Sequence, residues 1–225
     1  MLLYVNGDSH AAGMDIHDLG NSCKNTKSSF GYLLAERLGY DFATDALSGA
    51  SNDRILRTTK DFLKNNSKDI FVLIGWSTTD RREVLINNEY YSFAPGFKKT
   101  KDPIVNHEFE QYIMSLDHET VIKQNYYWHK KIYNFHLELQ QKNINHLFFN
   151  TYSIFNDNEH PDFTKTFYDW NHCMIGPYKD GETYYGWLKD NGYKVVAKNN
   201  YHYGADAHKR WADRLYNWLT QYQLL

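Results

Sequence analysis

Short apolar runs alternate with longer amphipathic stretches along this chain. The runs typical of buried strands are Leu2–Asn6, a weaker Tyr40–Leu47, Asp69–Ile74 and His146–Asn150. Apolar residues recur at helical spacing in Ser29–Leu38, in Ile55–Leu63 behind a cap at Ser51 or Asn52, in Asp117–Lys142 and from Gly204 onward. Such alternation is typical of a parallel sheet with helices on both faces. We therefore predict a three-layer α/β/α sandwich with a short parallel sheet.

Two long segments, residues 81–115 and 152–189, interrupt this alternation and lack clean periodicity. Insertions of this length are usually functional flaps or contain short elements of their own. Their aromatic residues are Tyr90, Tyr91, Phe93, Tyr168, Trp170, Tyr184, Tyr185 and Trp187. Packing of the insertions onto the body is favoured over a stacking wall for a sugar. The length of 225 residues and the absence of repeats or linkers predict a single domain over residues 1–225.

Ligands of parallel sheets bind beyond the carboxyl ends of the strands. The residues that follow predicted strand ends, and so should share one edge, are Ser9, Gly49, Gly75 and Thr151. Ser9 is a candidate nucleophile, because the turn at Gly7 after a buried strand lifts the serine out of the sheet. A serine hydroxyl needs a base, and His202 before the last helix is the candidate. Taken alone, Gly-Asp-Ser is an ordinary turn sequence.

Composition narrows the range of partners and compartments. Lys and Arg number 25 against 27 Asp and Glu, so no broad basic surface is expected and nucleic acid is not an expected partner. The sequence shows neither a secretion signal nor an apolar run of the ~18 residues that a membrane span needs. We expect a soluble cytoplasmic protein. Cys23 and Cys173 are expected to be free thiols in a reducing compartment.

Four segments, in this order, resemble the sequence blocks of the SGNH hydrolases, also called GDSL esterases. Gly7-Asp8-Ser9 matches the nucleophile block, and Gly49 matches the glycine of the second block. Gly75-Trp76-Ser77-Thr78 stands where the third block usually reads Gly-x-Asn-Asp. Asn199-Asn200-Tyr201-His202 stands where the last block reads Asp-x-x-His. The resemblance implies a flavodoxin-like strand order and an ester hydrolase.

The resemblance also implies the role of each matched residue. Ser9 would be the nucleophile and His202 its base, while the backbone N–H groups of Ser9 and Gly49 and the Ser77 hydroxyl would form the oxyanion hole. The substrate would be a small-molecule or carbohydrate ester, such as an O-acetylated sugar, and the chemistry needs no cofactor. The stretches Ser48–Arg57 and His208–Ala212 are similar to a phage-associated branch of the superfamily, which implies a phage gene.

Two positions depart from the family pattern. Ser77 replaces an asparagine and has a shorter side chain, and Asn199 replaces the aspartate that orients the histidine. An amide carries no charge to stabilise an imidazolium and can fix the wrong tautomer. Three alternatives stay open: a Ser–His dyad steadied by a backbone carbonyl, a carboxylate from elsewhere such as Asp206, or a site that no longer catalyses.

Other polar residues near the predicted edge have weaker claims to function. His10, Trp76 and Arg81 are candidate substrate-binding residues, whereas Asp8 is expected to brace its turn. Several neighbouring pairs or triplets resemble metal ligands: Asp15/His17/Asp18, His160/Asp162, His172/Cys173 and Asp206/His208. None has a recognised zinc spacing, so no metal is predicted.

Two functional hypotheses follow from the sequence. The first is an esterase or deacetylase that works through an acyl-Ser9 intermediate, with His202 as base. The second is a binding or structural protein, phage-related and glycan-binding, that keeps the hydrolase scaffold without turnover. A Ser9–His202 contact and a carboxylate behind the histidine would favour the first.

Overall fold

The computed structural model describes residues 1–17, 26–66, 69–156, 168–198 and 200–225. Its centre is a parallel sheet in the order β2-β1-β3-β6-β7. These strands are β1 (Leu2–Gly7), β2 (Asp41–Thr44), β3 (Ile70–Trp76), β6 (His146–Asn150) and β7 (Met174–Ile175). This is the strand order of flavodoxin-like folds. All five carboxyl ends therefore lie at one edge of the sheet.

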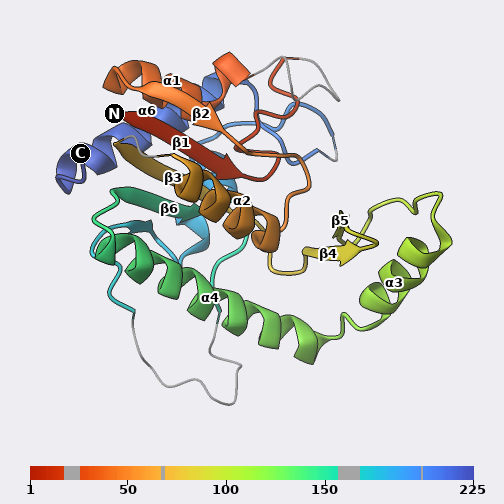
Figure 1. Cartoon of the computed structure of the whole chain (residues 1–225). Coiled ribbons are helices and arrows are strands. Elements are labelled where there is room, and N and C mark those ends of the chain that lie inside the picture. Colours follow the sequence, from red (N-terminus) through yellow and green to blue (C-terminus); the bar gives the residue numbers. More distant parts are fainter. Residues whose placement is uncertain (18–25, 67–68, 157–167, 199) are drawn as a thin grey trace.

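Helices cover both faces of the sheet, so the predicted three-layer sandwich is confirmed (Figure 1). One face packs against α1 (Phe30–Leu38), α5 (Tyr184–Asp190) and α6 (Ala205–Gln221). The other face packs against α2 (Asn52–Asn65) and α4 (His118–Gln141). None of the helices in the described part of the chain combines the length and apolar character that crossing a bilayer requires.

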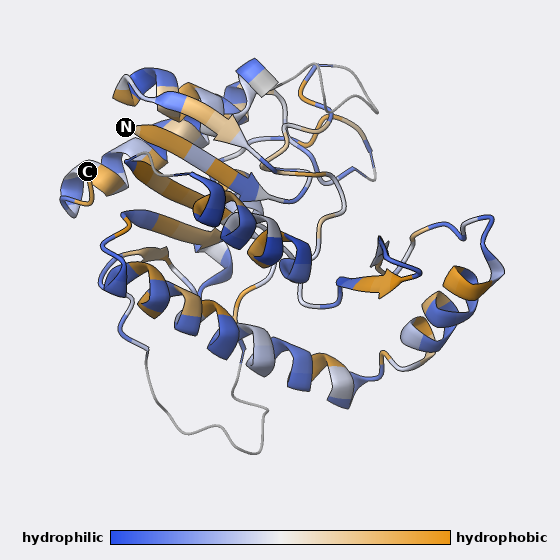
Figure 2. Cartoon of the chain, viewed as in Figure 1, coloured by the Kyte–Doolittle hydropathy of each residue, from blue (hydrophilic) through white to orange (hydrophobic). Residues whose placement is uncertain are grey.

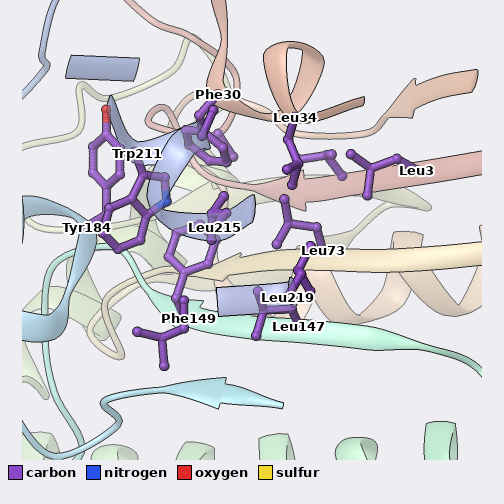
Figure 3. Close-up of a cluster of buried hydrophobic side chains, with 14 of the residues drawn as sticks. Leu3, Phe30, Leu34, Leu73, Leu147, Phe149, Tyr184, Trp211, Leu215 and Leu219 are labelled. Carbon is purple, nitrogen blue, oxygen red and sulfur yellow. The ribbon is translucent and has the colours of Figure 1, made fainter. Parts of the chain in front are cut away.

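The core follows from strand alternation, because successive side chains point to opposite faces. Leu3 and Leu73 enter the cluster under α1 and α6, which Figure 3 shows, whereas Tyr4 and Val72 enter the cluster under α2 and α4. Burial on both faces makes the central strands mostly apolar, and Figure 2 shows much of their length in orange, while the helices carry polar residues as well.

Apolar spacing and capping residues predicted the ends of most helices and strands to within a few residues. The Ser51 side chain caps α2 by accepting a hydrogen bond from the Arg54 N–H (3.3 Å), which decides between the two predicted caps. The predicted strand Tyr40–Leu47 is shorter, at Asp41–Thr44, because β2 is an edge strand paired with β1 alone. The long helix α4 lies inside its predicted range.

The insertion of residues 81–115 has regular structure. It contains a hairpin of β4 (Arg82–Ile86) and β5 (Glu89–Phe93), followed by α3 (Pro103–Met114). Phe93, Val105 and Tyr112 give this part a small core of its own, and Figure 1 shows it extending away from the sheet. The hairpin is tied to α2 by a two-pronged ion pair between Arg57 and Glu83, with both N···O distances at 2.8 Å.

The second insertion, residues 152–189, packs onto the body where it is described. Tyr184 of α5 is fully buried in the main core, and Trp170 is buried against α4. Phe93 of the first insertion is also buried. Tyr184 and Trp170 therefore support the packing interpretation for the second insertion, whereas Phe93 packs within the small core of the first insertion itself.

Candidate active site

A cavity of about 360 Å³ opens at the carboxyl edge of the sheet. It collects residues from both ends of the chain and from both insertions. Its lining includes Ser9 after β1, Gly49 after β2, Arg81 after β3, Tyr152 after β6 and His202 before α6. The loops that follow β1, β2, β3 and β6 therefore meet at one edge of the sheet, as the sequence predicted. The loop before α6 joins them there.

Ser9 owes its position to the tight end of β1. A Cβ added to Gly7 would lie 2.7 Å from the Ala11 Cβ and 2.8 Å from the Gly75 carbonyl oxygen, so the turn has room only for glycine. The turn continues with a hydrogen bond from the Met14 N–H to the Ser9 carbonyl oxygen (2.9 Å). Ser9 is 6% exposed and lines the cavity.

Asp8 fixes this turn to two neighbouring strands. Its carboxylate is buried and accepts hydrogen bonds from the His10 N–H (3.0 Å), the Ser77 hydroxyl (3.2 Å) and the Thr151 hydroxyl (3.0 Å). Those partners follow β1, β3 and β6. Arg81 completes the group with an Nη1–Oδ2 distance of 3.5 Å. Asp8 thus braces the turn, as the sequence predicted.

A carboxylate does stand behind His202, and it belongs to Asp15. The His202 Nδ1 and the Asp15 Oδ2 are 2.7 Å apart. The Asn200 side-chain amide donates to the same oxygen (2.9 Å), and the Asn200 Oδ1 accepts the His202 backbone N–H (2.7 Å). With Nδ1–H donating to Asp15, the lone pair of the imidazole is on Nε2, where a base needs it.

The two orienting groups named from the sequence do not take this position. Asp206 is exposed on the first turn of α6, and Asn199 lies outside the described residues. Sequence reasoning had noted Asp15 only as part of an apparent metal cluster. Its backbone has φ 61°, a left-handed conformation that Asp and Asn tolerate better than most residues, and this bend brings the carboxylate to His202. In the sequence, the polar turn that follows Ser9 was the feature that could have pointed to Asp15.

Within the described residues, no hydrogen bond joins Ser9 to His202, although both line the same cavity. The His10 ring lies edge-on to His202 with a centroid distance of 5.2 Å. Burial lowers the pKa of His10 to about 4, so this ring is neutral at pH 7. Contacts between nucleophile and base are often long in unliganded sites and tighten with substrate.

Gly49 lies where an oxyanion-hole donor is expected. Its φ is +78°, and an added Cβ would approach the Phe97 ring to 2.8 Å, so only glycine leaves this wall open. Phe97 comes from the first insertion, which therefore forms one side of the cavity together with Ala94 and Pro95.

Ser77 does not offer its hydroxyl proton to the cavity. That hydroxyl donates to Asp8 and accepts from the Arg81 Nη1 (3.0 Å), while the Ser77 N–H donates to the Asn52 side chain (2.8 Å). The predicted oxyanion role of the Ser77 side chain is therefore corrected. Arg81, whose guanidinium contacts this hydroxyl, lines the cavity, whereas Ser77 does not.

Trp76 was predicted to bind substrate, and this prediction was wrong. Strand alternation turns its side chain under α4, where it packs against Phe135 and Phe148 and is 1% exposed. Tyrosines form the rim instead: Tyr201 and Tyr152 are 57% and 39% exposed, with ring centroids 5.7 Å apart. His10 and Arg81 do line the cavity.

Sheet order and layering define the chain as a flavodoxin-like α/β/α protein, the fold class that the SGNH resemblance implies. A crystal structure of TesA matches it with a TM-score of 0.51 and 14% identity over 100% of both chains. A psychrotrophic esterase, EstA from Pseudoalteromonas sp., matches with a TM-score of 0.48 and 12% identity over 99% of this chain and 98% of EstA. Identities this low concern the fold alone.

The chain belongs to DUF6071, a family of unknown function whose sequence profile matches residues 16–165. Ser9 and His202 both lie outside the matched region. A search of curated proteins finds no match.

Proposed function

We propose that this protein is a serine hydrolase that cleaves ester bonds through an acyl-Ser9 intermediate. The observation that carries the proposal is the 2.7 Å contact between Asp15 and His202, in a cavity that Ser9 also lines. A nucleophile, a base and a buried carboxylate behind the base are the three parts of a catalytic triad, which is recognised by geometry rather than by sequence position.

In the proposed reaction the Ser9 Oγ attacks the ester carbonyl carbon while its proton passes to the His202 Nε2. The tetrahedral intermediate collapses, the C–O bond to the alcohol breaks, and His202 returns the proton to the departing oxygen. Water then attacks the acyl-enzyme and gives a proton to His202, the bond between the acyl carbon and the Ser9 Oγ breaks, and His202 returns the proton to that oxygen as the acid leaves. Asp15 holds the ring in the required tautomer and stabilises the imidazolium.

The developing oxyanion is the second requirement of this reaction. Backbone N–H groups of Ser9 and Gly49 would donate to it, each worth roughly 3 kcal/mol in the transition state. Arg81 would supply the third donor in place of the family's asparagine. Its guanidinium already contacts Asp8 and Ser77 from the cavity wall, so it is held in place before substrate arrives.

We further propose O-acetylated carbohydrate as the substrate class. Tyr152 and Tyr201 expose ring surface beside the cavity, and aromatic faces suit the apolar faces of sugar rings. Y152A and Y201A should lower kcat/KM for an acetylated sugar more than for p-nitrophenyl acetate, which lacks a sugar. Equal losses on both substrates would remove the carbohydrate from the proposal and leave the esterase.

The second proposal, a glycan-binding protein without turnover, is favoured by one observation. Ser9 and His202 make no hydrogen bond to each other within the described residues. Under this proposal the cavity binds a sugar and the triad geometry is a remnant.

A fluorophosphonate probe separates the two proposals, because it labels only serines that a base has activated. The esterase proposal expects labelling of the wild-type protein and of S48A, which changes another serine of the same cavity. S9A should not label. Absence of Ser9-dependent labelling, together with no hydrolysis of short acyl esters, would leave only the binding protein.

A further inference from the structure

A second group of reactive side chains lies away from the cavity, at the other end of the sheet. His136 comes from α4, His146 is the first residue of β6, and Cys173 immediately precedes β7. One ligand atom from each lies within 4.8 Å of the other two. All three residues are buried, at 0%, 2% and 8% exposure.

The hydrogen bonds of this group are incomplete. The His146 Nδ1 lies 2.8 Å from the Ile144 carbonyl oxygen, which requires a proton on Nδ1 and leaves the lone pair on Nε2. The His136 Nδ1 lies 2.8 Å from that Nε2. Within the described residues, the buried His136 Nε2 makes no hydrogen bond of ordinary geometry, although the Asp169 backbone lies beside this ring. In the same part of the chain, the Cys173 Sγ reaches only the Asn171 carbonyl oxygen, at 3.6 Å.

We propose that His136, His146 and Cys173 bind a zinc ion. Two imidazole nitrogens and one thiolate are a donor set that zinc prefers, and three protein ligands leave a fourth position for water. The contact from His146 to the Ile144 carbonyl is the usual outer contact of a metal-bound histidine, which fixes its tautomer. His136 frees its Nδ1 for the metal when its proton resides on Nε2.

Zinc binding requires the two imidazole rings to move apart. Two nitrogens on a tetrahedral zinc ion lie roughly 3.3 Å apart, given zinc–nitrogen bonds of about 2.0 Å. The two nitrogens now lie 2.8 Å apart, a hydrogen-bond distance, because one proton lies between them. To hold a zinc ion, the rings must therefore separate by about half an ångström. Zinc binding would release the thiol proton of Cys173 to solvent.

The position in the fold suggests what the ion does. β7 has only two residues and lies at the sheet edge, held by hydrogen bonds to β6 such as Phe148 N–H to the Cys173 carbonyl oxygen (2.8 Å). A zinc ion would join this edge to α4 and to the start of β6. Because the site is at the opposite end of the sheet from Ser9, an ion bound here would act independently of the proposed esterase activity.

Cobalt substitution tests the site in the intact chain. Protein stripped with a chelator under reducing conditions is titrated with Co²⁺, whose thiolate bond gives a charge-transfer band in the near ultraviolet. C23S is the matched control, since it removes the other cysteine of the sequence. We expect the band at one equivalent in the wild type and in C23S, and its loss in C173S. Zinc affinity should fall at least 100-fold in C173S, and zinc should raise the Tm of the stripped wild type by about 5 °C.

The wild-type and C23S titrations do not depend on how well C173S folds. No thiolate band in either protein, or a Tm that zinc leaves unchanged, would overturn the proposal. Equal zinc affinity in folded C173S and C23S would overturn it as well. The group would then be a buried histidine pair beside an unrelated thiol.

Discussion

Replacing Asp15 by asparagine isolates the charge behind His202 from the shape of the site. Asparagine has the same size, and it tolerates the left-handed backbone at this position, where φ is 61°. D15N should therefore fold normally. What it removes is the negative charge 2.7 Å from the His202 Nδ1. The carboxylate is 7% exposed, so water screens this charge little.

The magnitude follows from Coulomb's law and from one neighbouring residue. Unit charges about 4 Å apart interact by about 4 kcal/mol at an effective dielectric constant near 20, which is about a thousandfold in rate. The Asn200 amide donates to the position of the Asp15 Oδ2 at 2.9 Å. In D15N it would hold the amide oxygen of residue 15 toward His202 and preserve the tautomer. Removing this support in D15N/N200A should raise the total loss to about ten-thousandfold, the cost of the wrong tautomer.

The assay is kcat for p-nitrophenyl acetate at pH 8, together with the rate of fluorophosphonate labelling. D206N is the control, because Asp206 is exposed and lies in the next turn of chain after His202. It should keep wild-type rates. The reasoning fails if D15N stays within threefold of wild type, or if D206N shows the larger loss. A D15N loss unchanged by N200A would refute the role given to Asn200 alone.

Three further predictions concern His208, Arg81 and Gly7. Burial lowers the pKa of His208 to about 3. Below about pH 6.5 the unfolded chain therefore binds more protons than the folded chain, so the free energy of unfolding should fall as the pH drops from about 6.5 to about 3. H208Q should flatten this dependence in chemical denaturation, by on the order of 4 kcal/mol at the acid end. R81Q should reduce kcat about a hundredfold on neutral esters, whereas R82Q, which changes an exposed arginine, should not. Equal kcat values for R81Q and the wild type would exclude Arg81 from the oxyanion hole. G7A should lower the free energy of unfolding by about 3 kcal/mol, because its Cβ would meet Ala11 at 2.7 Å, and an unchanged denaturation midpoint would contradict this packing.

The sheet was predictable because its strands are apolar on both faces and its helices carry strong caps. The same property explains the error at Trp76. A strand buried on both sides has no polar alternation, so the pattern does not say which residues at its end turn toward the cavity. Ser77 and Trp76 are neighbours, and strand parity alone separates the residue near the site from the residue in the core.

Long-range pairings explain what the sequence analysis missed. Asp15 and His202 are 187 positions apart, and their contact depends on a left-handed bend that composition does not reveal. The group of His136, His146 and Cys173 was missed for a similar reason. The sequence paired Cys173 with its neighbour His172, whose ring stacks on Tyr222 instead, with centroids 3.9 Å apart. Spacing along a chain identifies ligand groups only where one turn or helix holds them.

The contacts of Asp8 indicate how, under the proposed function, Arg81 would replace the asparagine of the SGNH hydrolases. An oxyanion donor is effective when it is held in place before the reaction, since it then pays no reorganisation cost. Arg81 has a long and flexible side chain, which would otherwise be a poor replacement. Its contacts with the Asp8 carboxylate and the Ser77 hydroxyl restrict that freedom. Asp8 is in turn held by Thr151 after β6, so the guanidinium is fixed to three strand ends of the rigid sheet. Under the proposed function, Ser77 would therefore contribute by positioning Arg81.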